Sequence, residues 1–65
     1  MKVKDFIEII EADGWRFTRW GKGDHWIFKH DTKPGLVTVA GKPSQDIPEG
    51  TLHKMFRDAG LEFRR

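Results

Sequence analysis

The sequence predicts an α+β domain in which two helices lie on one face of a three-stranded antiparallel sheet, in the order α-β-β-β-α. Apolar residues recur at helical spacing near both ends of the chain, and the middle third alternates apolar and polar residues between glycine-containing turns. A length of 65 residues suffices for one domain only. We therefore expect residues 1–65 to form a single domain, with both helices on the same face of the sheet and the other face open.

The first helix is expected over residues 3–12. Its apolar side chains are spaced i, i+3, i+4 and i+7, which places them on one face: Val3, Phe6, Ile7 and Ile10. Gly14 follows, and glycine commonly supplies the left-handed residue that ends a helix.

Three strands are expected next, over residues 15–20, 25–30 and 36–39. Gly21-Lys22-Gly23-Asp24 is a turn long enough to join the first two as a hairpin. Pro34-Gly35 suits the central positions of a type II turn before the β-branched third strand. The three strands therefore form an antiparallel meander.

The tryptophans of this segment are expected to divide between core and surface. Trp15 and Trp26 are expected in the core. Trp20 falls off the apolar alternation and lies beside the turn, so we expect it to stack on a nucleic-acid base or to pack against a partner.

The second helix is expected to begin with a capping box at Asp46-Ile47-Pro48-Glu49, in which Asp46 accepts from first-turn amides and Glu49 reaches back. Helical spacing then continues through four apolar residues: Leu52, Met55, Phe56 and Ala59. Gly60 has the position of a C-cap, and Leu61 and Phe63 are expected to fold back on the core.

The composition excludes several functional classes. Without cysteine there is no disulfide framework, no thiolate nucleophile and no zinc finger, which fits a reducing cytoplasm. The apolar runs are too short to span a bilayer, and no membrane association is expected. Gly21-Lys22-Gly23 lies in a hairpin, so it is not a phosphate-binding loop between strand and helix. The histidines lack metal-ligand spacing, and we expect no metal and no cofactor.

Positive charge gathers in the middle of the chain. The net charge is only +2, but residues 15–42 hold six basic and two acidic residues, a net charge of +4. The same segment contains all three tryptophans, a combination that can hold phosphates with cations and bases with rings. A solvated sheet face with core aromatics explains the same pattern.

His25 is the candidate for chemistry, because the turn delivers it to the first position of a strand. With Trp26 and Phe28 turned toward the helices, His25 points to the open face. A histidine can transfer protons near neutral pH, and Lys22 and Lys29 would stabilise charge on phosphoryl oxygens. Taken alone, the pattern also describes an ordinary surface histidine. We expect His30 and His53 to be surface residues.

The order of elements and five motifs make the chain resemble the HicA (YcfA-like) toxins. The motifs are Asp13-Gly14-Trp15, the run from Gly23 to His30, Val37-Thr38-Val39, Pro48-Glu49-Gly50-Thr51-Leu52 and Ala59-Gly60-Leu61. The resemblance implies a double-stranded-RNA-binding-like fold and a metal-independent endoribonuclease that cleaves mRNA, an mRNA interferase. It also implies inhibition by a HicB-type antitoxin. The catalytic histidine of the family corresponds to His25.

Two positions depart from the family pattern. Asp24 stands where serine is common, and no histidine follows the third strand at Val39-Ala40-Gly41-Lys42. The residues expected to bind RNA are Arg16, Arg19, Trp20, Lys22 and Lys29. Two alternatives to a ribonuclease stay open, namely a non-catalytic RNA-binding module and a protein-docking module on the same fold.

Overall fold

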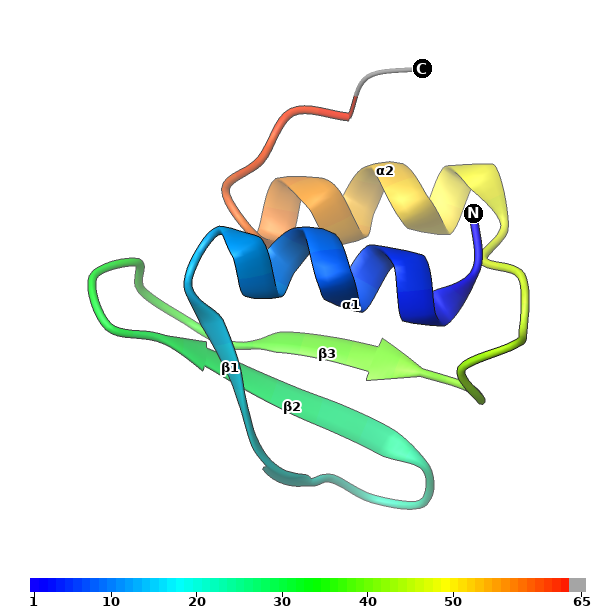
Figure 1. The fold of residues 1–65 in the computed structure, drawn as a ribbon, viewed down its shortest axis with the longest axis horizontal. Coiled ribbons are helices and arrows are strands. Elements are labelled where there is room, and N and C mark those ends of the chain that lie inside the picture. Colours follow the sequence, from blue (N-terminus) through cyan, green and yellow to red (C-terminus); the bar gives the residue numbers. More distant parts are fainter. Residues whose placement is uncertain (64–65) are drawn as a thin grey trace.

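The computed structural model describes residues 1–63, and Figure 1 shows two helices stacked on one side of a three-stranded sheet. The elements are α1 (Val3–Ala12), β1 (Trp15–Trp20), β2 (His25–His30), β3 (Val37–Ala40) and α2 (Glu49–Asp58). The strands are antiparallel in the order β1-β2-β3. The predicted fold class is thus confirmed, with the third strand displaced by one residue.

The core lies between the helices and the covered face of the sheet. The rings of Phe6 and Phe56 meet edge to face at 5.1 Å between centroids and so join α1 to α2. The sheet contributes every second residue of β2 and β3 on this face, including Phe28, Val37 and Val39, which are almost fully buried. A core of this size leaves the opposite face of the sheet without a covering layer.

The turn from α1 into β1 depends on glycine. Gly14 has a φ angle of +105°, which residues with a side chain rarely adopt. The chain reverses there and places Trp15, 1% exposed, at the start of the sheet. Trp15 lies in the core, as predicted. Its indole Nε1 donates to the backbone oxygen of Ala59 at 3.1 Å.

The predicted capping box at the start of α2 is wrong. The helix begins at Glu49 with Pro48 as its N-cap and no side-chain cap hydrogen bond. Ile47 precedes a proline, which restricts it to extended backbone and keeps the helix from starting earlier. Asp46 instead bridges to Lys2 through the backbone, and the Lys2 Nζ lies 3.7 Å from its carboxylate.

A bulge in β1 changes the direction of the residues that follow. The pairing with β2 shifts between Phe17 and Arg19, so Thr18 is the extra residue. Trp20 consequently pairs with Trp26 and lies on the same sheet face as Phe17. Trp26, expected in the core, is half-buried at the margin of the helical layer.

The segment that follows α2 folds back as predicted, as far as residue 63. Leu61 and Phe63 pack against the core, and the ring of Phe63 stacks on Phe56 with 5.3 Å between centroids.

Candidate functional site

Strand β2 carries two kinds of residue on its two faces. Because side chains alternate along a strand, His25, Ile27 and Lys29 lie on the open face, while Trp26 and Phe28 face the helices. His25 and Lys29 are exposed, as the sequence predicts. Two of the expected site residues are therefore held on one strand, with Ile27 between them on the same face.

His25 is exposed and unconstrained at its ring. Its backbone oxygen accepts a hydrogen bond of 2.6 Å from the amide of Gly21, which closes the hairpin. The imidazole makes no hydrogen bond, ion pair or ring contact with any other residue between 1 and 63. Both ring nitrogens are thus available to a ligand.

The hairpin turn also covers the apolar residue between His25 and Lys29. Ile27 is 7% exposed although it lies on the open face. A Cβ atom added at Gly21 would lie 3.0 Å from Ile27 Cδ1, so the turn packs directly against this side chain. The hydrophobic contact fixes the loop that precedes His25.

The basic residues of β1 join His25 and Lys29 on the open face. Arg19 pairs across the sheet with Ile27, and Arg16 pairs with Lys29. Arg16 forms an ion pair with Asp31. Arg19 and Lys29 have no ion-pair partner among the described residues. The open face therefore presents two cations that no carboxylate neutralises.

The remaining expected residues lie elsewhere. Lys22 and Asp24 are both exposed in the hairpin turn, so the turn itself carries no net charge. Trp20 lies on the opposite face of the sheet from His25, because its partner across the hairpin is Trp26. The structure thus places His25, Arg16, Arg19 and Lys29 on one face of the sheet and Trp20 on the other.

The two hollows with the largest volumes among those described border the sheet. One of about 410 Å³ follows β1 and is lined by residues of both faces, including Arg16, Lys29 and Phe17. The other, of about 400 Å³, lies between β3 and α2 and includes Leu36, Ile47 and Met55. His25 lines neither of them, so a ligand would meet this histidine on an open surface.

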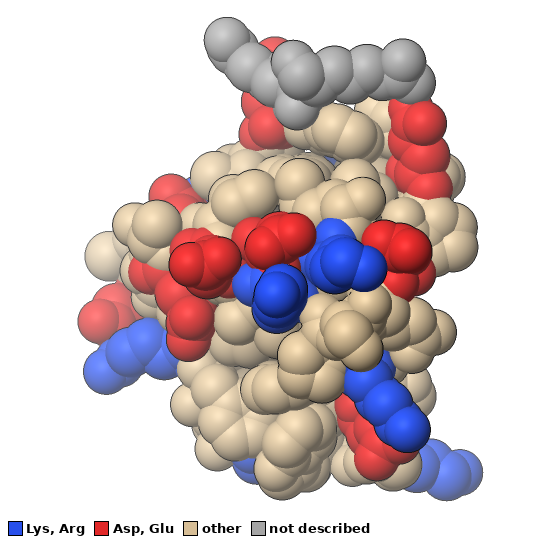
Figure 2. Space-filling model, turned by 45° about the vertical axis from the view of Figure 1, so that its right-hand side comes forward, with Lys and Arg blue, Asp and Glu red and all other residues tan. Residues whose placement is uncertain are grey.

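The side of the molecule shown in Figure 2 has a different charge character. The loop of residues 41–48 and the first turns of both helices come forward in this view. Acidic side chains gather on the left of this view, and the basic side chains in its centre lie between them and further acidic side chains, so no broad basic area forms there. This contrasts with the open sheet face and makes the helical ends a poor surface for a polyanion.

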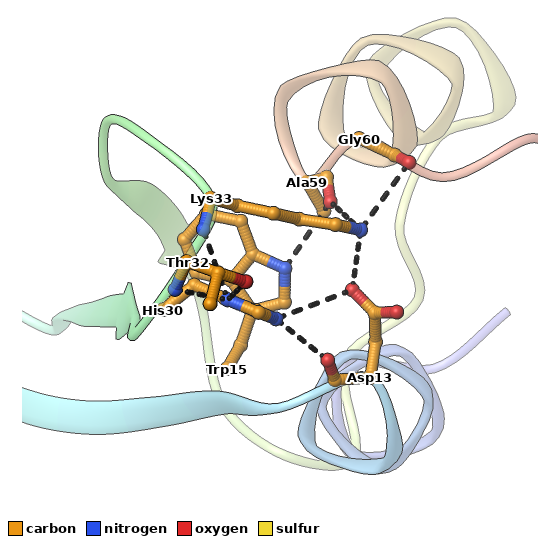
Figure 3. Close-up of polar contacts among 7 residues, drawn as sticks. All are labelled: Asp13, Trp15, His30, Thr32, Lys33, Ala59 and Gly60. Carbon is orange, nitrogen blue, oxygen red and sulfur yellow. Dashed lines mark hydrogen bonds and ion pairs between the residues drawn. The ribbon is translucent and has the colours of Figure 1, made fainter.

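His30 was expected at the surface, and this prediction is wrong. Its side chain is 10% exposed and its ring packs edge to face on Trp15, with 5.2 Å between centroids. Figure 3 shows it among residues from α1, the β2–β3 turn and the end of α2. The alternation along β2 would have predicted its burial, because it places His30 on the same face as Trp26 and Phe28.

Asp13 and Lys33 complete this cluster. The Lys33 Nζ donates to Asp13 Oδ2 at 2.5 Å and to the backbone oxygen of Ala59 at 3.2 Å. The hydrogen bond from Lys33 lowers the pKa of the Asp13 carboxyl, and the positive charge of Lys33 lowers it further. These contacts join three segments far apart in the sequence (Figure 3) and so serve the fold.

His53 is exposed on α2, as predicted, and its ring lies 4.3 Å from that of Phe63. Between residues 1 and 63, no three histidine or acidic side chains are grouped to hold a metal ion. Neither described helix has the length and apolar character that crossing a membrane requires.

The sequence is similar to a known protein family. A family model described as HicA toxin of bacterial toxin-antitoxin matches residues 3–61. The matched range includes both helices and all three strands. No curated protein matches the sequence.

Proposed function

Because the chain belongs to the HicA toxin family of bacterial toxin-antitoxin systems, we propose that it is a metal-independent endoribonuclease that cleaves mRNA with His25. The observation that carries the proposal is the placement of His25. Its imidazole is exposed on the open sheet face, with both nitrogens unoccupied and the cations Arg19 and Lys29 on the same face.

The proposed reaction uses the ribose 2′-hydroxyl, which RNA has and DNA lacks. The 2′-oxygen attacks the adjacent phosphorus, and neutral His25 takes the hydroxyl proton as a general base. The bond from phosphorus to the 5′-oxygen breaks, and that oxygen takes a proton from the imidazolium or from water. The products are a cyclic 2′,3′-phosphate and a free 5′-hydroxyl, so atoms and charge balance.

The cations of the open face would hold the substrate during this step. Arg19 and Lys29 are free to contact phosphate oxygens, which gain charge in the transition state. Lys22 in the turn and Arg16 at the far end of β1 extend the positive surface on either side. A single histidine without an orienting partner gives modest acceleration, which is sufficient for a toxin that needs few cuts.

The partner proposed from the family is a HicB-type antitoxin. An inhibitor that covers His25 would also face Arg19 and Lys29, and carboxylates on the inhibitor would complement these cations. We therefore expect the antitoxin to present an acidic surface to the open face, and the complex to weaken as salt concentration rises.

The test is cleavage of a long single-stranded RNA by the purified chain in the presence of a chelator. His25→Ala is compared with the parent, and His53→Ala serves as the matched control because it removes an exposed histidine from α2. We expect the first variant to lose activity about a hundredfold and the second to keep it. Analysis of the fragment ends should find cyclic phosphate.

Equal cleavage by the parent and His25→Ala would remove this histidine from the chemistry. RNA binding without cleavage by either protein would favour the non-catalytic RNA-binding module. Cleavage that stops in chelator would overturn the metal-independent mechanism.

A further inference from the structure

Three aromatic rings form a continuous cluster on the helix side of the sheet, beyond the helices. Phe17, Trp20 and Trp26 contact one another, with centroids 4.6 to 5.7 Å apart. We call these three residues the ring cluster. It exists because the bulge at Thr18 turns Trp20 toward Phe17.

The ring cluster is left uncovered by the fold. Only the first residue of β1 is buried, because α1 lies over the start of this strand and the hairpin continues past the helical layer (Figure 1). Phe17 is 41% exposed and Trp20 is 54% exposed. An exposed aromatic patch of this kind marks a binding surface more often than isolated apolar residues do.

The indole nitrogen of Trp26 already has a hydrogen-bond partner within the protein. The Nε1 of Trp26 donates to the backbone oxygen of Gly41 at 3.1 Å, which fixes this ring. Trp20 packs against the fixed ring with 4.6 Å between centroids. The cluster therefore offers preorganised ring faces, the feature needed for stacking.

The ring cluster lies directly behind the candidate catalytic residue. His25 and Trp26 are consecutive in β2, so their side chains leave the same stretch of backbone on opposite faces. Arg19, which precedes Trp20 in the sequence, lies on the open face, and Lys22 follows two positions after Trp20 in the turn. The hollow along β1, an edge strand of the sheet, is lined by Lys29 of the open face and by Phe17 of the ring cluster.

We propose that the ring cluster stacks unpaired bases of the same RNA strand whose phosphate lies at His25, with the strand passing around the β1 edge. This inference rests on the proposed function and specifies its substrate as RNA with unpaired nucleotides beside the cleavage site. A nucleic acid fits the charge of the same hairpin, because Arg19 and Lys29 lie on its other face without an ion-pair partner among the described residues. Bases of any sequence stack on such rings.

The test measures binding, so that it does not depend on cleavage. The affinity of a fluorescein-labelled single-stranded RNA is measured by anisotropy for the His25→Ala protein and for the same protein carrying Trp20→Ala. Leu36→Ala is the matched control, because Leu36 is 46% exposed and precedes β3 at the other edge of the sheet. Urea unfolding of each variant confirms that it is folded.

We expect Trp20→Ala to weaken binding of single-stranded RNA about tenfold and Leu36→Ala to leave it unchanged. A duplex of the same sequence should bind both proteins equally, since its bases are already stacked. Unchanged RNA affinity in Trp20→Ala would overturn the proposal, and a weaker antitoxin complex in that variant would then assign the rings to a protein interface. If the parent fails to cleave RNA but Trp20→Ala still loses affinity, the ring cluster stands and the ribonuclease proposal falls.

Discussion

The Nε2 atom of His30 lies 2.7 Å from the backbone carbonyl oxygen of Asp13, which ties the end of β2 to the end of α1. The Nδ1 atom of the same ring accepts hydrogen bonds of 3.1 Å from the amides of Thr32 and Lys33. A carbonyl oxygen only accepts and an amide only donates, so this arrangement requires a neutral ring with its proton on Nε2. A histidine in the middle of the chain thus organises the junction of three segments.

Replacing His30 with phenylalanine should therefore destabilise the fold. The ring volume is retained, but the amides of Thr32 and Lys33 lose their acceptor and the Asp13 carbonyl loses its donor. We expect the free energy of unfolding to fall by about 2 kcal/mol in urea titrations. His30→Asn should lose less, because its side-chain oxygen can accept from the amide two residues on. Equal stability of the parent and His30→Phe would contradict this account.

Asp13→Asn should lower the free energy of unfolding at neutral pH and change it little in acid. The pKa of Asp13 is lowered in the folded state, chiefly by the hydrogen bond from Lys33. A lowered pKa means that the ionised carboxyl stabilises the fold above its unfolded pKa of about 4, and that this contribution disappears as pH falls through the folded value. Unfolding of both proteins at pH 7 and at pH 2.5 measures the difference.

Asp31→Asn is the control for that experiment, because its ion pair with Arg16 is exposed on both sides. Such pairs contribute little to stability, so this variant should unfold like the parent at both pH values. A stability difference for Asp13→Asn that is the same at pH 7 and pH 2.5 would show that the carboxylate charge is not the cause.

Two glycine substitutions should act in opposite directions. Gly14→Ala places a side chain at a φ of +105° and a Cβ atom 2.8 Å from His30 Nε2, so we expect a loss of about 2 kcal/mol or more. Gly50 lies within α2 with nothing within 4 Å of an added Cβ, so Gly50→Ala should raise stability by up to about 1 kcal/mol. Midpoints of thermal unfolding would report both, and a stabilised Gly14→Ala protein would refute the described turn.

The ion pair between Arg16 and Asp31 should limit RNA binding. Asp31→Asn leaves the guanidinium free for phosphate, so RNA affinity in a His25→Ala background should rise severalfold at low salt. Lys29→Ala should lower the affinity and reduce the slope of log affinity against log salt concentration by about one. Titrations at four salt concentrations distinguish the two effects, and a slope unchanged by Lys29→Ala would exclude a phosphate contact at this lysine.

The sequence predicts the elements well because their signals are local and redundant. Helical spacing defines α1, and glycine-containing turns separate three strands whose alternation shows which residues are covered. The start of α2 was mispredicted because the pattern from Asp46 to Glu49 competes with the proline within it. Asp46 also forms a backbone bridge with Lys2. No local sequence pattern indicates this contact, because the two residues are 44 positions apart.

The candidate site was predictable only in part. The exposure of His25 follows from its place opposite Trp26 and Phe28 in the alternation, because those two residues face the helices. The position of Trp20 could not be predicted in this way, because a one-residue bulge at Thr18 turns every later side chain of β1 to the other face. No distinctive sequence pattern marks this bulge. The ion pair that occupies Arg16 likewise depends on the register between β1 and β2.

The alternation in β2 separates two kinds of evolutionary change along one strand. Substitutions at positions 25 and 29 alter what the molecule touches, whereas substitutions at positions 26, 27 and 28 alter how well it holds together, because Ile27 is buried under the hairpin turn. Related proteins can therefore change the exposed positions of this strand while the buried positions preserve the fold. Deep mutational scanning of these five positions would separate into two independent groups, one sorted by interaction and one by abundance.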